Sequence, residues 1–158
     1  MSVKLSVKNK TMNEISFIIN TAPTAQARPR HAVRGGFSVT YKSEQQKNNE
    51  QTLEALIAPY APKEPFKNAV SINFVAYIPF PQSFSKKKKE LAKANKIFPT
   101  KKPDIDNLCK QLLDTLTRLN FWLDDKQVIK ITAIKIYGEY GKWDVIITGY
   151  NDKLNENN

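Results

Sequence analysis

The spacing of apolar residues along the chain divides it into strand-like and helix-like segments. Alternating, β-branched or aromatic residues predict strands at 13–20 and 69–80, and a later pair at 127–138 and 142–150. The sequence GEYG at 138–141 separates the last two strands, so we expect them to pair as an antiparallel hairpin. Both strands carry apolar residues on parts of both faces, which predicts a sheet that is covered on both sides.

Two segments carry the signals of helices. One runs from about Ser43, a suitable N-cap, to Ile57, after which prolines end it. The other covers 107–119, with Asp106 at the position of the N-cap and Asn107 able to share that role. Its apolar stripe follows the 3.6-residue period and consists of Leu108, Leu112, Leu116 and Leu119, with Leu113 beside them.

Residues 21–41 are predicted to form a loop, because they hold two prolines, a Gly-Gly pair and small polar residues. This loop carries Arg28, Arg30 and Arg34, which are candidate contacts to nucleic-acid phosphates. The alternative is a mobile basic loop without that role.

The order of these elements predicts the fold class. Strand, helix, strand, basic segment, helix and two strands indicate an α+β domain with a small mixed, mostly antiparallel sheet packed with two main helices. Residues 1–12 are a polar lead-in, 13–150 form a single domain, and 151–158 are a polar tail.

Composition narrows the partners and the chemistry. The chain of 158 residues has 25 Lys and Arg against 15 Asp and Glu, a net charge of +10, which attracts polyanions. Nucleic acid is the expected partner, and an anionic membrane surface is the alternative. We expect no membrane span and no signal peptide, since no apolar run is long enough, and therefore a cytoplasmic protein.

The scarcity of cysteine and histidine restricts any metal site. A single cysteine, Cys109, excludes an internal disulfide, and with one histidine the chain has no zinc-ligand cluster. A metal would therefore be held by oxygen ligands, which favour Mg²⁺, with Mn²⁺ as an alternative.

The segment 83–102 concentrates positive charge, with eight lysines against one glutamate. It is compatible with a short basic helix from Ser85 to Lys96 that contacts DNA, or with a solvated charged surface. Phe80, Phe84 and Phe98 flank the lysines, as core anchors or as groups that stack on unpaired bases.

Acidic residues gather just after this basic segment. Asp104 and Asp106 are two residues apart, so in an extended backbone their carboxylates point the same way and could hold a divalent cation. Lys110 follows four residues after Asp106, on the same helical face, where it forms an ion pair or contacts a phosphate. The alternative without a metal is that Asp106 only caps the helix and that Asp104 is a solvated neighbour.

A third acidic position lies in the sequence FWLDD. Phe121, Trp122 and Leu123 are expected to anchor this stretch in the core and to fix the carboxylates that follow, one of which would be a third metal ligand. Asp124 and Asp125 are equally compatible with turn chemistry, and the local pattern does not choose between them.

The sequence PDIDNLCKQLLDTLTRLNFWLDDKQV, residues 103–128, resembles the signature of the RusA-like endodeoxyribonucleases that resolve Holliday junctions. The pattern is D-x-D-N-L-x-K, then an aspartate in the helix, then F-W-x-D-D-x-Q-V. The sequence ARPR at 27–30 also fits the family, whereas 83–102 is expected to be an insertion.

The resemblance implies a homodimeric, Mg²⁺-dependent nuclease that cuts four-way DNA junctions, encoded by a bacterium, prophage or phage. By the same resemblance Asp104, Asp106 and Asp125 bind the metal, and Lys110 is catalytic. Lys101 and Lys102 contact DNA, and Asp114 has a secondary role. A two-fold dimer would give two symmetric nicks in a junction that is itself two-fold symmetric.

Two other classes of function stay open on the sequence. One is a non-catalytic basic nucleic-acid-binding module whose aspartates only cap a helix. The other is a nuclease that acts on RNA or on flap structures. Cleavage that depends on a divalent cation separates the first from a nuclease, and the choice of substrate separates the second.

Overall fold

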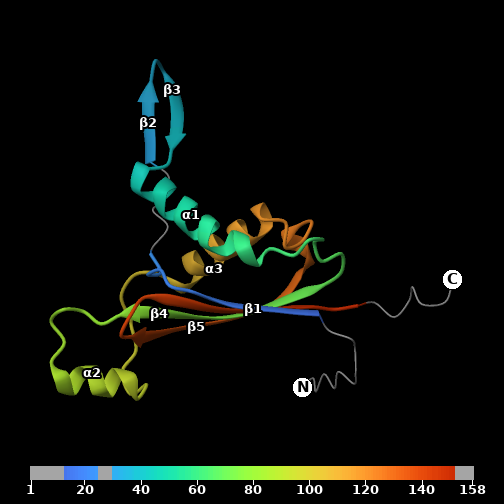
Figure 1. Ribbon diagram of the computed structural model, residues 1–158. Coiled ribbons are helices and arrows are strands. Elements are labelled where there is room, and N and C mark those ends of the chain that lie inside the picture. Colours follow the sequence, from blue (N-terminus) through green and yellow to red (C-terminus); the bar gives the residue numbers. More distant parts are fainter. Residues whose placement is uncertain (1–12, 25–29, 152–158) are drawn as a thin grey trace, which may run out of the picture.

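A four-stranded mixed sheet is the framework of the fold (Figure 1). The computed structural model describes residues 13–24 and 30–151. The sheet is built from β1 (Asn13–Ile19), β4 (Val70–Pro79), β5 (Val128–Gly138) and β6 (Lys142–Gly149). Their order is β1-β6-β4-β5, with β6 antiparallel to β1 and β4, and β5 parallel to β4. The predicted α+β class is confirmed.

The predicted hairpin between the last two strands is wrong, because β4 lies between β5 and β6. Residues 139–141 pass the end of β4 to connect them. A Cβ at Gly141 would lie only 2.4 Å from the Cα of Ala22, so this turn packs too closely for a side chain. Strand β4 holds the central position because Val70, Ile72 and Phe74 are buried along it.

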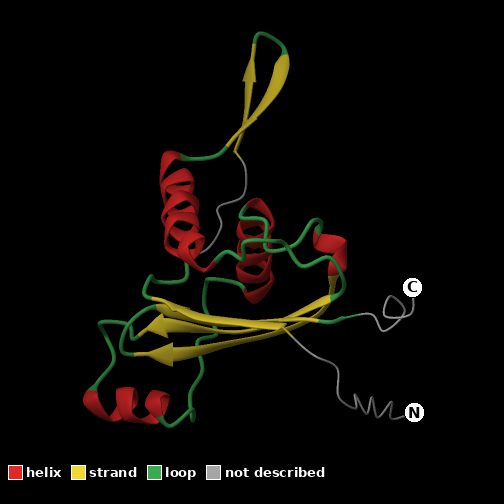
Figure 2. Ribbon diagram, turned by 45° about the vertical axis from the view of Figure 1, so that its right-hand side comes forward, coloured by secondary structure: helices red, strands yellow, loops and turns green. Residues whose placement is uncertain are grey.

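Two helices cover one face of the sheet (Figure 2). They are α1 (Glu44–Ile57), followed by the 3₁₀ turn η1 (Ala58–Tyr60), and α3 (Ile105–Arg118). On the other face Ile18 and Ile134 remain 50% and 48% exposed, so the prediction of a sheet covered on both sides is wrong. None of the helices in the described ranges is both long and apolar enough to cross a membrane.

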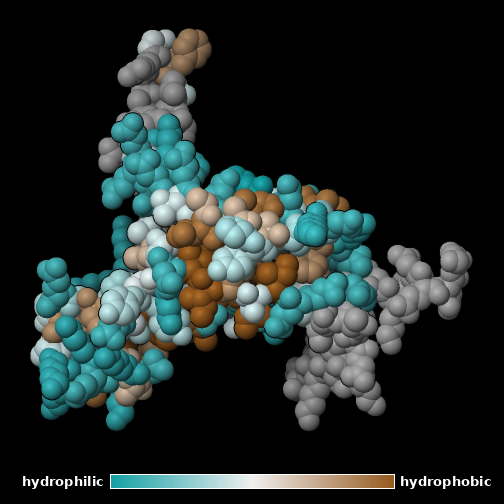
Figure 3. All heavy atoms as spheres, viewed as in Figure 1, coloured by the Kyte–Doolittle hydropathy of each residue, from teal (hydrophilic) through white to brown (hydrophobic). Residues whose placement is uncertain are grey.

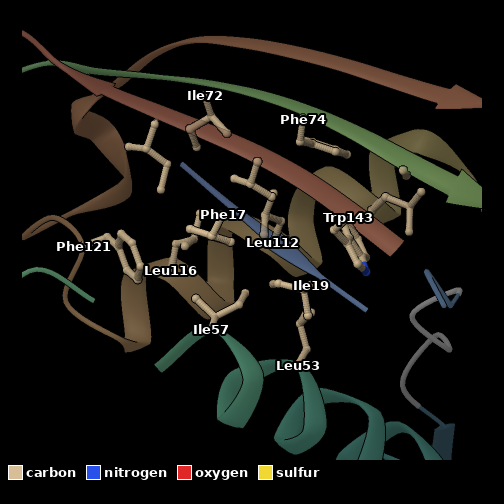
Figure 4. Close-up of a cluster of buried hydrophobic side chains, with 14 of the residues drawn as sticks. Phe17, Ile19, Leu53, Ile57, Ile72, Phe74, Leu112, Leu116, Phe121 and Trp143 are labelled. Carbon is tan, nitrogen blue, oxygen red and sulfur yellow. The ribbon is translucent and has the colours of Figure 1, made fainter. Parts of the chain in front are cut away.

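The hydrophobic core lies between the sheet and these two helices (Figure 4). Helix α3 supplies Leu108, Leu112 and Leu116, all fully buried, which confirms its predicted apolar stripe. Each fully buried leucine contributes roughly 1.5–3 kcal/mol relative to exposure, so this stripe fixes α3 firmly on the sheet. Helix α1 begins as predicted, since the Ser43 hydroxyl accepts a hydrogen bond from the Gln46 amide at 3.3 Å.

The loop predicted at 21–41 contains a hairpin instead. Strands β2 (Arg30–Arg34) and β3 (Phe37–Tyr41) are antiparallel and are joined by Gly35 and Gly36. The φ angles of these glycines are 59° and 83°, and two positive φ values in a two-residue turn are what glycine provides. The hairpin extends away from the rest of the molecule beyond the start of α1 (Figures 1 and 2).

The basic segment contains the helix α2 (Lys86–Lys93), shorter than the predicted 85–96. Ser85 is its N-cap and accepts a hydrogen bond from the Lys88 amide. Helix α2 lies on the side of the sheet opposite α1 and α3, at one end (Figure 2). The predicted lead-in 1–12 and the tail from 152 onward lie outside the described residues.

Candidate active site

Helix α3 begins earlier than its sequence suggested. Its N-cap is Asp104, in extended conformation, and Asp106 belongs to the first helical turn. The prediction that Asp106 or Asn107 is the N-cap is therefore wrong, and so is the argument that two extended residues point their carboxylates the same way. Asp104 and Asp106 nevertheless both lie at the N-terminal end of α3.

The carboxylates at this helix end are available for binding. Asp104 and Asp106 are exposed, and within the described residues the Asp104 side chain makes no capping hydrogen bond. The amide groups at a helix N-terminus carry partial positive charge, which attracts negatively charged groups. This end of α3 therefore presents two anionic oxygen donors to solvent.

The negative charge of Asp106 affects the pKa of Cys109, which lies in the same helix. The thiol is free and half-buried. Burial raises the pKa of Cys109, and the negative charge of Asp106 raises this pKa further. Both effects oppose formation of the thiolate.

Lys110 lies one turn after Asp106 and forms an ion pair with Asp114. The distance from Lys110 Nζ to Asp114 Oδ2 is 3.4 Å, and the lysine side chain is 67% exposed. Such an exposed i,i+4 pair contributes about 0.3–0.5 kcal/mol, so it holds the ammonium only loosely. The Lys110 ammonium group is therefore close to Asp106 in sequence. Its ion pair with Asp114 is weak enough to be exchanged for another anion.

Lys135 of β5 fastens the basic stretch that precedes Asp104. Its Nζ donates hydrogen bonds to the carbonyl oxygens of Lys101 and Pro103, at 2.9 and 2.8 Å. The side chains of Lys101 and Lys102 are exposed. The segment just before α3 thus lies against the C-terminal half of β5. The exposed side chains of Lys101 and Lys102 are therefore near the N-terminal end of α3.

Asp124 and Asp125 have different roles in the loop before β5. The Asp124 carboxylate caps the 3₁₀ turn η2 (Asp125–Gln127) by accepting from the Lys126 amide at 2.9 Å. That hydrogen bond, and next the Lys126 side chain, hold the pKa of Asp124 below its usual range. Asp125 is exposed at the start of η2, and its predicted role as a metal ligand stays a prediction.

Gln127 clamps this loop, a role that the sequence reading missed. Its Oε1 accepts from the amides of Leu123 and Asp124, and its Nε2 donates to the carbonyls of Phe66 and Asn68, all at 2.9–3.0 Å. Gln127 is the glutamine of the F-W-x-D-D-x-Q-V pattern, so the signal was present in the sequence but had no assigned meaning.

Two of the three predicted anchors of the FWLDD stretch are in the core. Phe121 and Trp122 are fully buried, and Trp122 Nε1 donates to Thr117 Oγ1 at 2.9 Å. Leu123 is 68% exposed, so its prediction as an anchor is wrong. Trp122 forms an isolated β-bridge with Phe66. Successive side chains of an extended backbone point to opposite sides, so Leu123 points to solvent while Trp122 points into the core.

The structure does not bring Asp125 to the other two carboxylates within one chain. Asp104 and Asp106 lie at the start of α3, whereas Asp125 follows its far end, and a helix of 14 residues is roughly 21 Å long. Among the described residues no three acidic, histidine or cysteine side chains are close enough to hold a metal ion. Carboxylates suit a hard cation in kind, and of the three predicted ligands only Asp104 and Asp106 lie at the same end of α3.

Of the three arginines predicted to contact DNA, two lie in the part of the chain that the structure describes. Arg28 lies outside the described residues. Arg30 and Arg34 begin and end β2, in the projecting hairpin. Their predicted role in contacting DNA stays a prediction.

Comparison with known proteins identifies the family. The model of the family described as "Endodeoxyribonuclease RusA" matches residues 20–148. The chain belongs to the RusA family. The match includes α3, the Gln127 clamp, β4, β5 and all of β6 but its last residue, and it begins directly after β1.

Individual relatives support the RusA assignment. The chain is 34% identical to the uncharacterized protein YqaN of Bacillus subtilis over 138 residues, which cover 86% of this chain and 96% of that protein. It is 30% identical to the crossover junction endodeoxyribonuclease rusA of Lactococcus phage r1t over 100 residues, 63% of this chain and 71% of the relative. It is 39% identical to the crossover junction endodeoxyribonuclease RusA of Escherichia coli O139:H28 over 51 residues, 32% of this chain and 42% of the relative.

Proposed function

We propose that this RusA-family protein is a divalent-cation-dependent endonuclease that resolves four-way DNA junctions by paired symmetric nicks. The observation that carries the proposal is the N-terminal end of α3. There, two exposed carboxylates stand beside a loosely held lysine in a chain of net charge +10. Two relatives bear the name crossover junction endodeoxyribonuclease, which points to the same substrate.

In this proposal Asp104 and Asp106 hold the cation and Lys110 contacts the scissile phosphate. Mg²⁺, or Mn²⁺ in its place, would supply an activated water and stabilise the leaving 3′-oxygen. Lys110 can reach a phosphate by giving up its exposed pair with Asp114, and its positive charge then opposes the negative charge that develops on the phosphate. Asp114 thereby serves as the resting partner of Lys110.

The basic residues around the site would bind the DNA backbone. Lys101 and Lys102 precede the carboxylates on a loop that Lys135 fixes, and in our proposal they would contact phosphates near the cut. Arg28, Arg30 and Arg34 would contact the junction arms farther away. These contacts supply affinity and orientation rather than recognition of sequence.

The third carboxylate, in our proposal, comes from a second copy of the chain. Strand β5 is an edge of the sheet, and its residues from Ile129 to Thr132 are exposed in succession. Ile129 is 65% and Ile131 is 41% exposed. A long apolar edge strand is a ready site for pairing with another strand, which makes β5 a candidate dimer interface.

An antiparallel β5–β5 pairing about a two-fold axis would complete the site. The start of each β5 would then lie beside the end of the other, and Lys135 fastens the segment before Asp104 to that end. Asp125 of the partner subunit would approach Asp104 and Asp106 of the first. One chain lacks this arrangement, whereas a two-fold dimer forms it twice, once for each nick.

The decisive experiment is incubation with a synthetic four-way junction, with and without Mg²⁺, and mapping of both cut strands. We expect paired nicks at symmetric positions that need the cation. Asp104→Asn is expected to abolish nicking while junction binding persists, since it removes negative charge near phosphates. Junction binding by the wild type with no cleavage in Mg²⁺ or Mn²⁺ would instead support a non-catalytic nucleic-acid-binding module.

A further inference from the structure

A cavity of about 810 Å³ lies at the end of the sheet where β4 and β5 finish and β6 begins. Its walls come from the C-terminal part of α2, from β4 and β5, and from the turn between β5 and β6. This volume is within the range of sites that hold a small organic group such as a nucleotide. None of the residues assigned to catalysis lines it.

Three tyrosines and two lysines give the cavity its chemical character. The tyrosines are Tyr77, Tyr137 and Tyr140, and Tyr140 is 77% exposed. Lys142 Nζ lies 4.4 Å from the centre of the Tyr77 ring, directly across the β4–β6 pairing. Aromatic rings beside lysines are the composition of sites that bind single-stranded nucleic acid by stacking bases and neutralising phosphates.

The remaining lining groups are compatible with an anionic strand. Among the described residues that line the cavity, Glu139 is the only acid, and its carboxylate lies 3.9 Å from Lys93 Nζ. Asn20 and Asn95 add amides that can donate to and accept from base edges. The net charge of the lining is therefore positive.

Strand β5 connects the cavity with the candidate active site. Ile136, Tyr137 and Gly138 line the cavity, and the residue before them, Lys135, holds the carbonyls of Lys101 and Pro103. The segment that leads into Asp104 passes around this edge from α2, where hydrophilic side chains gather (Figure 3). The cavity and the start of α3 thus lie near the same end of β5, on opposite faces of the sheet, so a DNA strand would have to pass around this edge to reach both.

We propose that this cavity binds an unstacked nucleotide of the DNA strand at the branch point. The base would stack on Tyr140, and the adjoining phosphate would lie near Lys142 and Lys93. The inference rests on the proposed function, since a four-way junction is what supplies unpaired or weakly stacked nucleotides beside the cut. Duplex DNA presents no free base face, so the aromatic wall selects a single strand.

The first test uses single-stranded DNA, independently of junction cleavage. A short oligothymidylate that carries one 5-iodouracil is bound to the full-length protein, irradiated, and the crosslinked peptide is identified by mass spectrometry. We expect crosslinks to Tyr140. Tyr140→Ala should weaken oligonucleotide binding about fivefold to a hundredfold, the effect of losing one stacked base, while Tyr140→Phe retains it.

Matched lysine variants separate the cavity from general basic charge. Lys142→Gln should weaken binding and reduce the salt dependence by about one phosphate contact. Lys67→Gln serves as the control, because Lys67 is exposed near the opposite end of β4 and pairs with Glu64. Crosslinks that map only elsewhere, or wild-type binding by both Tyr140→Ala and Lys142→Gln, would overturn the proposal.

The second test places 5-iodouracil in a four-way junction, either at the branch or within an arm, in the absence of divalent cation. We expect crosslinks to Tyr140 from the branch alone. Equal crosslinking from the duplex arms would refute a single-nucleotide site. If Tyr140 captures the oligonucleotide but the protein cuts no junction in Mg²⁺, the cavity assignment survives and the proposed function fails.

Discussion

Asp124 and Asp125 are identical and adjacent residues, but the fold gives their carboxylates different surroundings. Asp124 is engaged by the Lys126 amide and side chain, whereas Asp125 starts the 3₁₀ turn with an exposed carboxylate. The family pattern selected Asp125 from the sequence. The residue pattern alone did not, because which of two neighbours caps a turn depends on backbone angles that only the fold defines.

Gln127 provides the first test at this scale. Gln127→Ala leaves two amides and two carbonyls of the loop without their partner, so we expect a loss of roughly 1–3 kcal/mol in the free energy of unfolding. Urea denaturation measures this change. Gln51→Ala, at an exposed position on α1, is the control and should change stability little. An unchanged Gln127→Ala protein would show that the clamp does not hold the loop.

The pH response of Cys109 tests the position of Asp106. Because the Asp106 charge opposes formation of the thiolate, Asp106→Asn should lower the pKa of Cys109. The pKa should stay above its ordinary value, since burial, the larger cause, remains. Iodoacetamide alkylation, which follows the thiolate, should therefore become faster at a given pH. Asp114→Asn is the comparison, and an equal effect from it would contradict the assignment.

At the scale of elements, prediction succeeded where a signal was local. Helix α3 was found from its leucine period, and α1 from its Ser43 cap and the prolines after it. The β2–β3 hairpin was not predicted although Gly35 and Gly36 are a hairpin signal, because the prolines and small polar residues of 21–41 are equally typical of an irregular loop. The pairing of β5 could not be predicted from local sequence. Nothing in the residues of β5 and β6 shows that β4 lies between these two strands.

The exposed edge of β5 provides the test at this scale. A double variant, Ile129→Lys with Ile131→Lys, replaces two exposed apolar side chains of this edge with charges, and charged side chains on an edge strand oppose pairing with another strand. We expect the wild type to be a dimer and the variant a monomer by light scattering coupled to size-exclusion chromatography. Ile18→Lys, on the opposite edge strand, should remain dimeric. A dimeric double variant would exclude β5 as the interface.

At the scale of the whole molecule, the sequence located the acidic residues but not the distances between them. Asp104 and Asp125 are close in the chain, so a compact site seemed natural from the pattern. The rigid helix between them separates the two positions, and the contacts of Trp122 and Gln127 keep the loop at the far end. In our proposal a site with three carboxylates would be a property of an assembly, which the pattern of a single chain does not display.

Mixing of inactive subunits tests this conclusion directly. Asp104→Asn and Asp125→Asn homodimers each have both shared sites damaged, but a heterodimer of the two has one intact site and one doubly damaged site. Since about half of the dimers in an equal mixture are heterodimers, the mixture should regain nicking, as single rather than paired cuts. Mapping of the cut strands on a four-way junction measures this. Mixing Asp104→Asn with Asp106→Asn is the control and should stay inactive, because both residues belong to the same half of the site. No recovery in the first mixture, with exchange of subunits verified, would mean that Asp125 does not complete the site of a partner.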